Sequence, residues 1–139
     1  MPMPGEYENA SRDFDSFIED AKQESLLQTS HQTYTMVQSV FQAFRRRLSV
    51  NDAIRFANVL PAVARALFVA DWDPDEPQKP FEDLEAMTRD VRTLRPNHNV
   101  SPDTAIHDVS VALRKHVRAD TFDVLLASLP AGAAEFWRV

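Results

Sequence analysis

Four acidic side chains have the spacing of a calcium-binding loop. Asp71, Asp73 and Asp75 stand at positions 1, 3 and 5 of a notional twelve-residue loop, and Glu82 stands at position 12. An EF-hand places its oxygen ligands in this way. However, the sixth position, which requires a sharply turning glycine, is Glu76, and prolines stiffen the backbone that would have to wrap the ion. We therefore expect an acidic, proline-rich linker and no metal site.

The histidines do not form a metal-binding or catalytic pattern, since neither H-x-x-x-H nor HExxH occurs. His107 and His116 are nine residues apart on one expected helix, which places them on opposite faces. Asp103 and His107 are four residues apart, so they could pair on one face, either as a solvated pair or as a buried pair tuned for catalysis. The residues favour a non-catalytic protein over an enzyme, and they leave Asp103 and His107 as candidate ligand-binding residues.

Two residue counts exclude several kinds of chemistry. The chain has only 2 glycines, neither in a glycine-rich loop, so it lacks the loops that cradle a nucleotide phosphate and the nucleophile elbow of hydrolases. It has 0 cysteines, which excludes disulfides, zinc–thiolate and iron–sulfur sites and a cysteine nucleophile. We therefore expect no cofactor.

Two arginines are the strongest remaining candidates for a binding role. Arg45 and Arg114 each stand near the C-terminal end of an amphipathic segment, at the edge of its apolar stripe. A half-buried arginine can bind an anionic ligand or a partner's carboxylate through two hydrogen bonds. In the structural alternative, the stem packs along the core and the guanidinium bonds a carboxylate or terminal carbonyls of a neighbouring helix. The sequence favours this alternative and keeps Arg45 and Arg114 as candidate anion-binding residues.

Charge and hydropathy argue against nucleic acid and membranes as partners of this protein. The chain has 21 acidic and 15 basic residues, a net charge of -6, which disfavours general binding to nucleic acid. The segment that would serve as a recognition helix, residues 61–69, is mostly apolar, so we expect no sequence-specific nucleic-acid binding. No apolar run approaches the roughly 18 residues of a membrane span. The polar, acidic start does not resemble a secretory signal. We expect a cytoplasmic protein with no membrane segment.

The elements that would position these residues occur twice along the chain. Residues 33–69 align without a gap with residues 102–138 at a shift of 69 positions, and Leu-Pro at 60–61 recurs at 129–130. Helical periodicity and capping residues predict four helices in each copy. The expected helices of the first copy are 13–27, 31–48, 49–60 and 61–69. Those of the second are 81–94, a helix from Pro102 with Ser101 as its N-cap, 121–128 with Asp120 as its cap, and 130–137.

The expected fold is therefore all-α, with eight short helices in two duplicated four-helix units, residues 13–69 and 81–138, packed about a pseudo-twofold axis. An acidic, proline-rich linker, residues 70–80, joins them, and residues 1–12 are expected to be a disordered tail. Each unit alone has roughly 55–60 residues, which is marginal for independent folding. We therefore expect a single domain over residues 13–139.

The order of short motifs carries a family resemblance. Arg-Leu-Ser stands at 47–49, Leu-Pro at 60–61 and Asp-Trp-Asp-Pro at 71–74, and a second copy follows with its own Leu-Pro and an aromatic residue at Trp137. The sequence resembles the bacterial family catalogued as domain of unknown function 2267. The resemblance implies an all-helical fold with no assigned biochemical activity, and it supplies no catalytic or ligand residues.

The absence of a catalytic pattern and the large apolar helix faces predict a non-catalytic helical module that binds another protein. The alternative is small-molecule or anion binding, with or without catalysis, in the crevice between the repeats. A deep polar crevice lined by Arg45, Arg114 or His107 would favour the alternative, whereas a shallow seam filled by aromatic side chains would favour the first. A homodimer is one further way to cover the apolar fourth helices.

Overall fold

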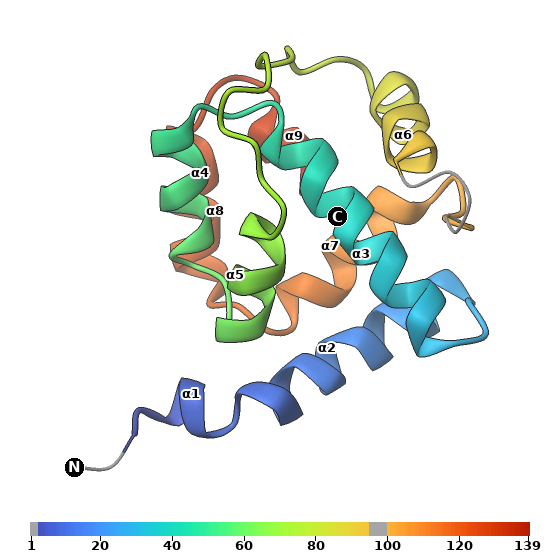
Figure 1. Cartoon of the computed structure of the whole chain (residues 1–139), viewed down its shortest axis with the longest axis vertical. Helices are drawn as coiled ribbons and strands as arrows, with labels where there is room; N and C mark the ends of the chain where they lie inside the picture. The colour runs from blue at the N-terminus through green and yellow to red at the C-terminus, as the bar shows by residue number, and fades with distance from the viewer. Residues whose placement is uncertain (1–2, 95–99) are drawn as a thin grey trace.

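The computed structural model describes residues 3–94 and 100–139, which form helices and no strand (Figure 1). The predicted all-α class is confirmed. The helices of the described residues are α1 (Gly5–Glu8), α2 (Ala10–Ser25), α3 (Ser30–Arg45), α4 (Val50–Ala57), α5 (Ala62–Val69), α6 (Leu84–Thr93), α7 (Ala105–Arg114), α8 (Ala119–Ser128) and α9 (Ala133–Phe136).

Helix α3 lies in the middle of the molecule. It contacts α2, α5, α6 and α7, and nearly every residue from Thr35 to Arg45 is buried. Its buried residues include polar ones such as Gln38 and Ser39, so the burial of α3 follows from the helices that surround it. Helix α2 packs on both α7 and α3, while α6 packs on α3, so helices from both ends of the chain cover the same central element. The pseudo-twofold relation between the two halves stays a prediction.

Aromatic rings fill the centre of the core. The ring of Phe44 lies 4.7 Å from that of Phe56, 4.9 Å from that of Phe136 and 5.3 Å from that of Trp137. Phe68 and Trp137 have 0% exposure. One continuous cluster of buried residues draws members from α2 through to the C-terminal end of the chain. Packing of this kind makes each large ring depend on neighbours from distant parts of the sequence.

Local capping signals set several helix starts. The Ser49 side chain accepts a hydrogen bond from the Asp52 amide at 3.2 Å and caps α4, as the sequence predicts. Asp83 caps α6 in the same way, accepting from the Ala86 amide at 2.8 Å. Among the described residues, no helix combines the length and hydropathy that crossing a membrane requires.

The N-terminal part of the structure differs from the sequence prediction. Residues expected in a disordered tail form α1 and the first turn of α2, which begins at Ala10. The Pro4 carbonyl accepts the first hydrogen bonds of α1, and Glu6 pairs with Arg65 of α5 at 3.2 Å. An ion pair between residues this far apart leaves no local sequence signal, so the local pattern does not indicate a helical start of the chain.

Three helix starts in the second half were also predicted wrongly. Helix α7 begins at Ala105 with Thr104 before it, so Ser101 is not its N-cap, and α8 begins before Asp120. The last helix, α9, covers only four residues, because Gly132 adopts a left-handed φ of 102° that interrupts the expected helix from Pro130. A Cβ at Gly132 would lie 2.6 Å from the Phe81 Cβ, so close packing also requires glycine here. With the unexpected α1, the described residues hold nine helices where eight were expected.

Candidate functional site

Arg45 lies buried at the C-terminal end of α3. Its Nη1 donates to the carbonyl oxygens of Phe68 and Ala70 at 2.9 and 3.0 Å. Its guanidinium carbon lies 5.3 Å from the centre of the Trp72 ring. Carbonyl groups at a helix C-terminus carry partial negative charge, so the arginine is placed favourably at the end of α5. Arg45 thereby holds α5 and the segment after it against α3.

Arg114 makes the corresponding bond in the second half. Its Nε donates to the Trp137 carbonyl at 2.9 Å, and the alignment at a shift of 69 pairs Arg45 with Arg114 and Phe68 with Trp137. Arg114 also forms an ion pair with Asp123 at 2.9 Å. Both arginines therefore bond terminal carbonyls, which is the structural alternative in the sequence analysis.

A small cavity of about 230 Å³ lies beside Arg45, between the C-terminal end of α3, the N-terminus of α4 and the linker. Burial lowers the pKa of Arg45, while the nearby carboxylates of Glu76 and Asp71 act in the opposite direction. The residues that line this Arg45 cavity are Arg45, Arg46, Leu48, Ser49, Val50, Trp72, Pro74, Glu76 and Gln78.

The next two arginines share one acidic residue of α6. Arg46 Nη1 lies 2.7 Å from Asp90 Oδ1, and Arg47 Nη1 lies 2.7 Å from Asp90 Oδ2. Glu82 contacts Arg47 at 3.0 Å, and Glu76 contacts Arg46 at 2.5 Å. No local pattern in the sequence indicates this network, because Asp90 is more than forty residues from both arginines. These side chains tie the linker and α6 to the end of α3.

The candidate pair of Asp103 and His107 does not form. Asp103 instead contacts Arg92 at 2.6 Å, and His107 is exposed on α7. Residues four positions apart share a face only when both lie in one helix, and α7 begins at Ala105, which leaves Asp103 outside it.

The four acidic residues with the spacing of a calcium-binding loop are engaged in separate local features of the structure. Asp73 Oδ1 accepts a hydrogen bond from the Asp75 amide at 2.9 Å, and Glu82 belongs to the Arg47 ion pair. Asp71 has a left-handed φ of 55°. Within residues 3–94 and 100–139, no three His, Cys, Asp or Glu side chains are grouped closely enough to hold a metal ion.

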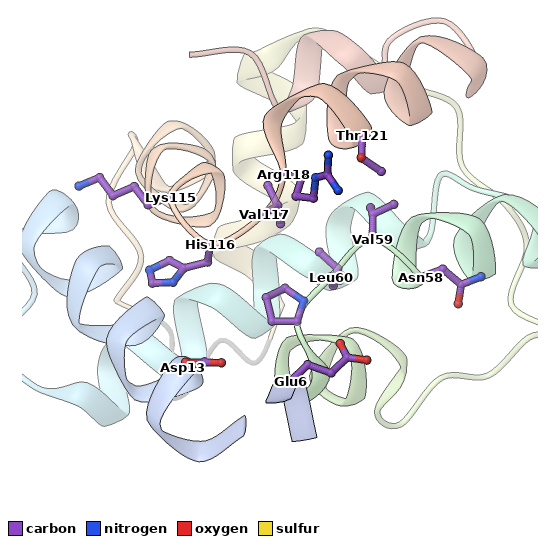
Figure 2. Close-up of a pocket in the computed structure, with 11 residues that line it drawn as sticks. Glu6, Asp13, Asn58, Val59, Leu60, Lys115, His116, Val117, Arg118 and Thr121 are labelled. Atoms are coloured by element: carbon purple, nitrogen blue, oxygen red, sulfur yellow. The ribbon is translucent and has the colours of Figure 1, made fainter. Parts of the chain in front are cut away.

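A larger crevice, of about 630 Å³, opens between the N-terminal helices and two interhelical turns (Figure 2). One turn joins α4 to α5 and the other joins α7 to α8, so both halves contribute. Glu6 and Asp13 lie on the side of the N-terminal helices in Figure 2, opposite the turn that carries His116 and Arg118. None of Arg45, Arg114, His107 or Asp103 is among the lining residues, which are Glu6, Asp13, Asn58, Val59, Leu60, Pro61, Lys115, His116, Val117, Arg118 and Thr121.

One wall of the crevice contains a long-range polar contact. His116 Nε2 lies 2.7 Å from Asp20 Oδ2, and the His116 ring lies 5.9 Å from that of Phe17. The contact joins the turn after α7 to the middle of α2. No motif in the sequence indicates this pair, because its members are 96 residues apart.

Helices α4 and α8 lie side by side (Figure 1). Ile54 of α4 is 50% exposed and Val124 of α8 is 73% exposed. Arg55 Nη2 donates to Ser128 Oγ at 2.5 Å and links the two helices. We call this surface the α4–α8 face: it comprises Ile54 and a groove of about 520 Å³ lined by Arg55, Val59, Asp120, Thr121, Val124, Leu125 and Ser128.

The comparison with known families agrees with the resemblance stated from the motifs. The family model described as uncharacterized conserved protein (DUF2267) matches residues 14–136. No curated protein showed significant similarity to the chain. The match includes helices α3 to α9 and therefore the Arg45 cavity and the α4–α8 face. The chain belongs to the DUF2267 family of uncharacterized conserved proteins.

Proposed function

We propose that this protein is a non-catalytic helical module that binds another protein through the α4–α8 face. The observation that carries the proposal is the exposure of Val124 in a groove whose lining also includes Val59 and Leu125, with Ile54 exposed on the adjoining helix α4. Grouped exposed apolar side chains mark interaction surfaces, because water contact with them is unfavourable. A groove between two helices suits an amphipathic helix of a partner.

The contacts of the candidate ligand-binding residues support a non-catalytic function. Arg45 and Arg114 bond main-chain carbonyls at the ends of neighbouring segments, and Asp103 forms an ion pair with Arg92. Such contacts serve packing and need no substrate. A net charge of -6 and the lack of cysteine are compatible with action in the cytoplasm, which we include in the proposal.

The test is site-specific photo-crosslinking in native lysate, with the crosslinking amino acid at position 124. We expect a discrete crosslinked protein that disappears when Ile54→Arg is added to the same chain. The matched control carries the crosslinker at Leu26, which is 86% exposed at the C-terminal end of α2, away from α4 and α8 (Figure 1). Equal products from positions 124 and 26, or no discrete product at 124, would reject the proposal. A product that joins two copies would make the partner a second copy of this chain.

A second candidate function is small-molecule binding in the crevice. Its support is the volume of about 630 Å³ and the presence of both acidic and basic side chains around it. Asn58 is exposed and lines the crevice, so Asn58→Trp should fill part of the space without disturbing the core. A metabolite that raises the Tm of the original protein and fails to raise that of Asn58→Trp would support this function.

A further inference from the structure

Arg45 is a buried cation without a paired carboxylate among the described residues. It is only 5% exposed, yet its guanidinium has no acidic side chain within ion-pair distance. Every other buried or half-buried arginine of the described residues has one: Arg46, Arg47, Arg65 and Arg114. A buried charge is costly unless an opposite charge and hydrogen bonds compensate it.

The aligned positions explain this difference. Arg114 pairs with Asp123 at 2.9 Å, and the shift of 69 places Ile54 where Asp123 stands in the second half. Arg114 also lies over the Phe122 ring, at 5.2 Å, and the position aligned with Phe122 is Ala53. Arg45 therefore lacks both neighbours on α4, and its ring contact is with Trp72 in the linker.

The space beside Arg45 has the character of an anion site. Arg45 and Trp72 both line the cavity of about 230 Å³, and Arg45 Nε is buried without a hydrogen-bond partner. Ser49 and Val50 place the N-terminus of α4 on the same wall, where backbone amides carry partial positive charge. Two independent sources of positive potential therefore meet at one small cavity.

Two acidic side chains act on the charge of Arg45 from nearby, Glu76 and Asp71. Glu76 lines the cavity, but its carboxylate contacts Arg46 at 2.5 Å, which offsets its charge. Asp71 is exposed to water, where its field is screened. The pKa of Arg45 is lowered because burial outweighs the attraction of these two carboxylates.

We propose that the Arg45 cavity binds a small organic carboxylate, with its oxygens at Arg45 and the N-terminus of α4 and its flat apolar part against Trp72. The planar donors of a guanidinium match the two oxygens of a carboxylate. The indole ring offers an apolar wall for the remainder of the ligand. The cavity is smaller than the roughly 300–1,000 Å³ of pockets for drug-sized ligands, so the ligand has few atoms beyond the carboxylate and one ring. This site is separate from the α4–α8 face.

Benzoate and its neutral analogue benzamide are suitable probes, with tryptophan fluorescence as the readout. Trp72 lines the cavity, whereas the other tryptophan, Trp137, is fully buried. We expect a saturable fluorescence change with benzoate. Benzamide should bind at least about tenfold more weakly than benzoate, because the charge-assisted hydrogen bonds are lost. Trp72→Phe should abolish the signal. Equal binding of the two probes, or no saturable change with benzoate, would overturn the proposal.

A pair of variants at Val50 tests the charge requirement. Val50 lines the cavity and is 42% exposed at the first position of α4, where both Glu and Gln are tolerated in a helix. Val50→Glu places a carboxylate at the cavity and should weaken benzoate binding about tenfold or more, while Val50→Gln, its neutral match, should change it less than about threefold. Equal affinities of the two variants would refute the anion site. Unchanged circular dichroism establishes that both are folded.

Discussion

Asp90 of α6 bonds Arg47 at the end of α3: the Asp90 Oδ2 atom lies 2.7 Å from Arg47 Nη1, and the Arg47 side chain has 0% exposure. The Asp90 side chain is itself only 8% exposed, so the pair is buried. Arg47 also donates to the Ala43 carbonyl at 2.6 Å, which fixes the guanidinium at the last turn of α3. A buried pair of this kind joins two helices that are remote in sequence.

Removal of Asp90 should destabilise the fold strongly. Asp90→Ala leaves the buried Arg47 with the Glu82 carboxylate and the Ala43 carbonyl, and breaking a buried pair on one side costs about 3–5 kcal/mol. Urea denaturation followed by circular dichroism measures the free energy of unfolding. Glu85 of the same helix pairs with Arg89 on the surface, so Glu85→Ala is the control and should change stability by less than about 0.5 kcal/mol. A similar small effect for Asp90→Ala would show that the pair is not important for stability.

Asp108 should make stability depend on pH in the direction opposite to most carboxylates. Burial raises the pKa of Asp108, and the hydrogen bond from Thr104 Oγ1, 2.7 Å long, opposes the rise only in part. Because the folded pKa lies above the unfolded one, ionised Asp108 costs stability at neutral pH. That cost is relieved as the pH falls through the raised pKa.

Asp108→Asn should therefore raise the free energy of unfolding at pH 7, since the amide can still accept from Thr104. The gain should disappear once the pH is below about 3.9, the ordinary pKa of an aspartate, because Asp108 is then protonated in both states. Urea denaturation of both proteins at several pH values gives the difference. A gain that is equal at all pH values would contradict the titration of Asp108 as its source.

Trp137 should couple the two halves of the chain. Its ring lies 6.2 Å from Phe41, 5.3 Å from Phe44 and 5.5 Å from Phe56, all of which belong to the first half. Trp137→Ala should cost about 3–5 kcal/mol. Hydrogen exchange should show lower protection in residues 13–69 as well as in residues 81–139. If protection fell only in the second half, the halves would be independent units.

Gly132 should tolerate no side chain. Gly132→Ala requires a left-handed φ from alanine and brings its Cβ to 2.6 Å from the Phe81 Cβ. We expect a loss of about 1–3 kcal/mol in unfolding free energy. Gly5→Ala is the matched control, because a Cβ there meets nothing within 4 Å. Thermal denaturation should separate the two variants clearly, and an equal Tm for both would refute the packing argument.

Much of the fold and part of the site could be predicted from local patterns. The apolar spacing in residues 31–48 predicts a helix, and the structure has α3 over most of it; Ser49 predicts the cap of α4 because a serine hydroxyl reaches an amide three residues away. The same spacing placed Arg45 at the edge of the apolar stripe, with neighbouring carbonyls as its structural partners, as found. These features depend on residues within a few turns of one another.

Other features depend on tertiary structure alone. The bonds of Asp90 to Arg47 and of His116 to Asp20 join residues 43 and 96 positions apart, and no local pattern indicates such partners. Helical spacing alone indicates that Arg45 stands at the end of a helix. Among the described residues, Arg45 has no carboxylate partner and adjoins a cavity, and neither fact can be seen in the sequence. The reason is that burial and pairing depend on segments that are distant in the chain and meet only when it folds.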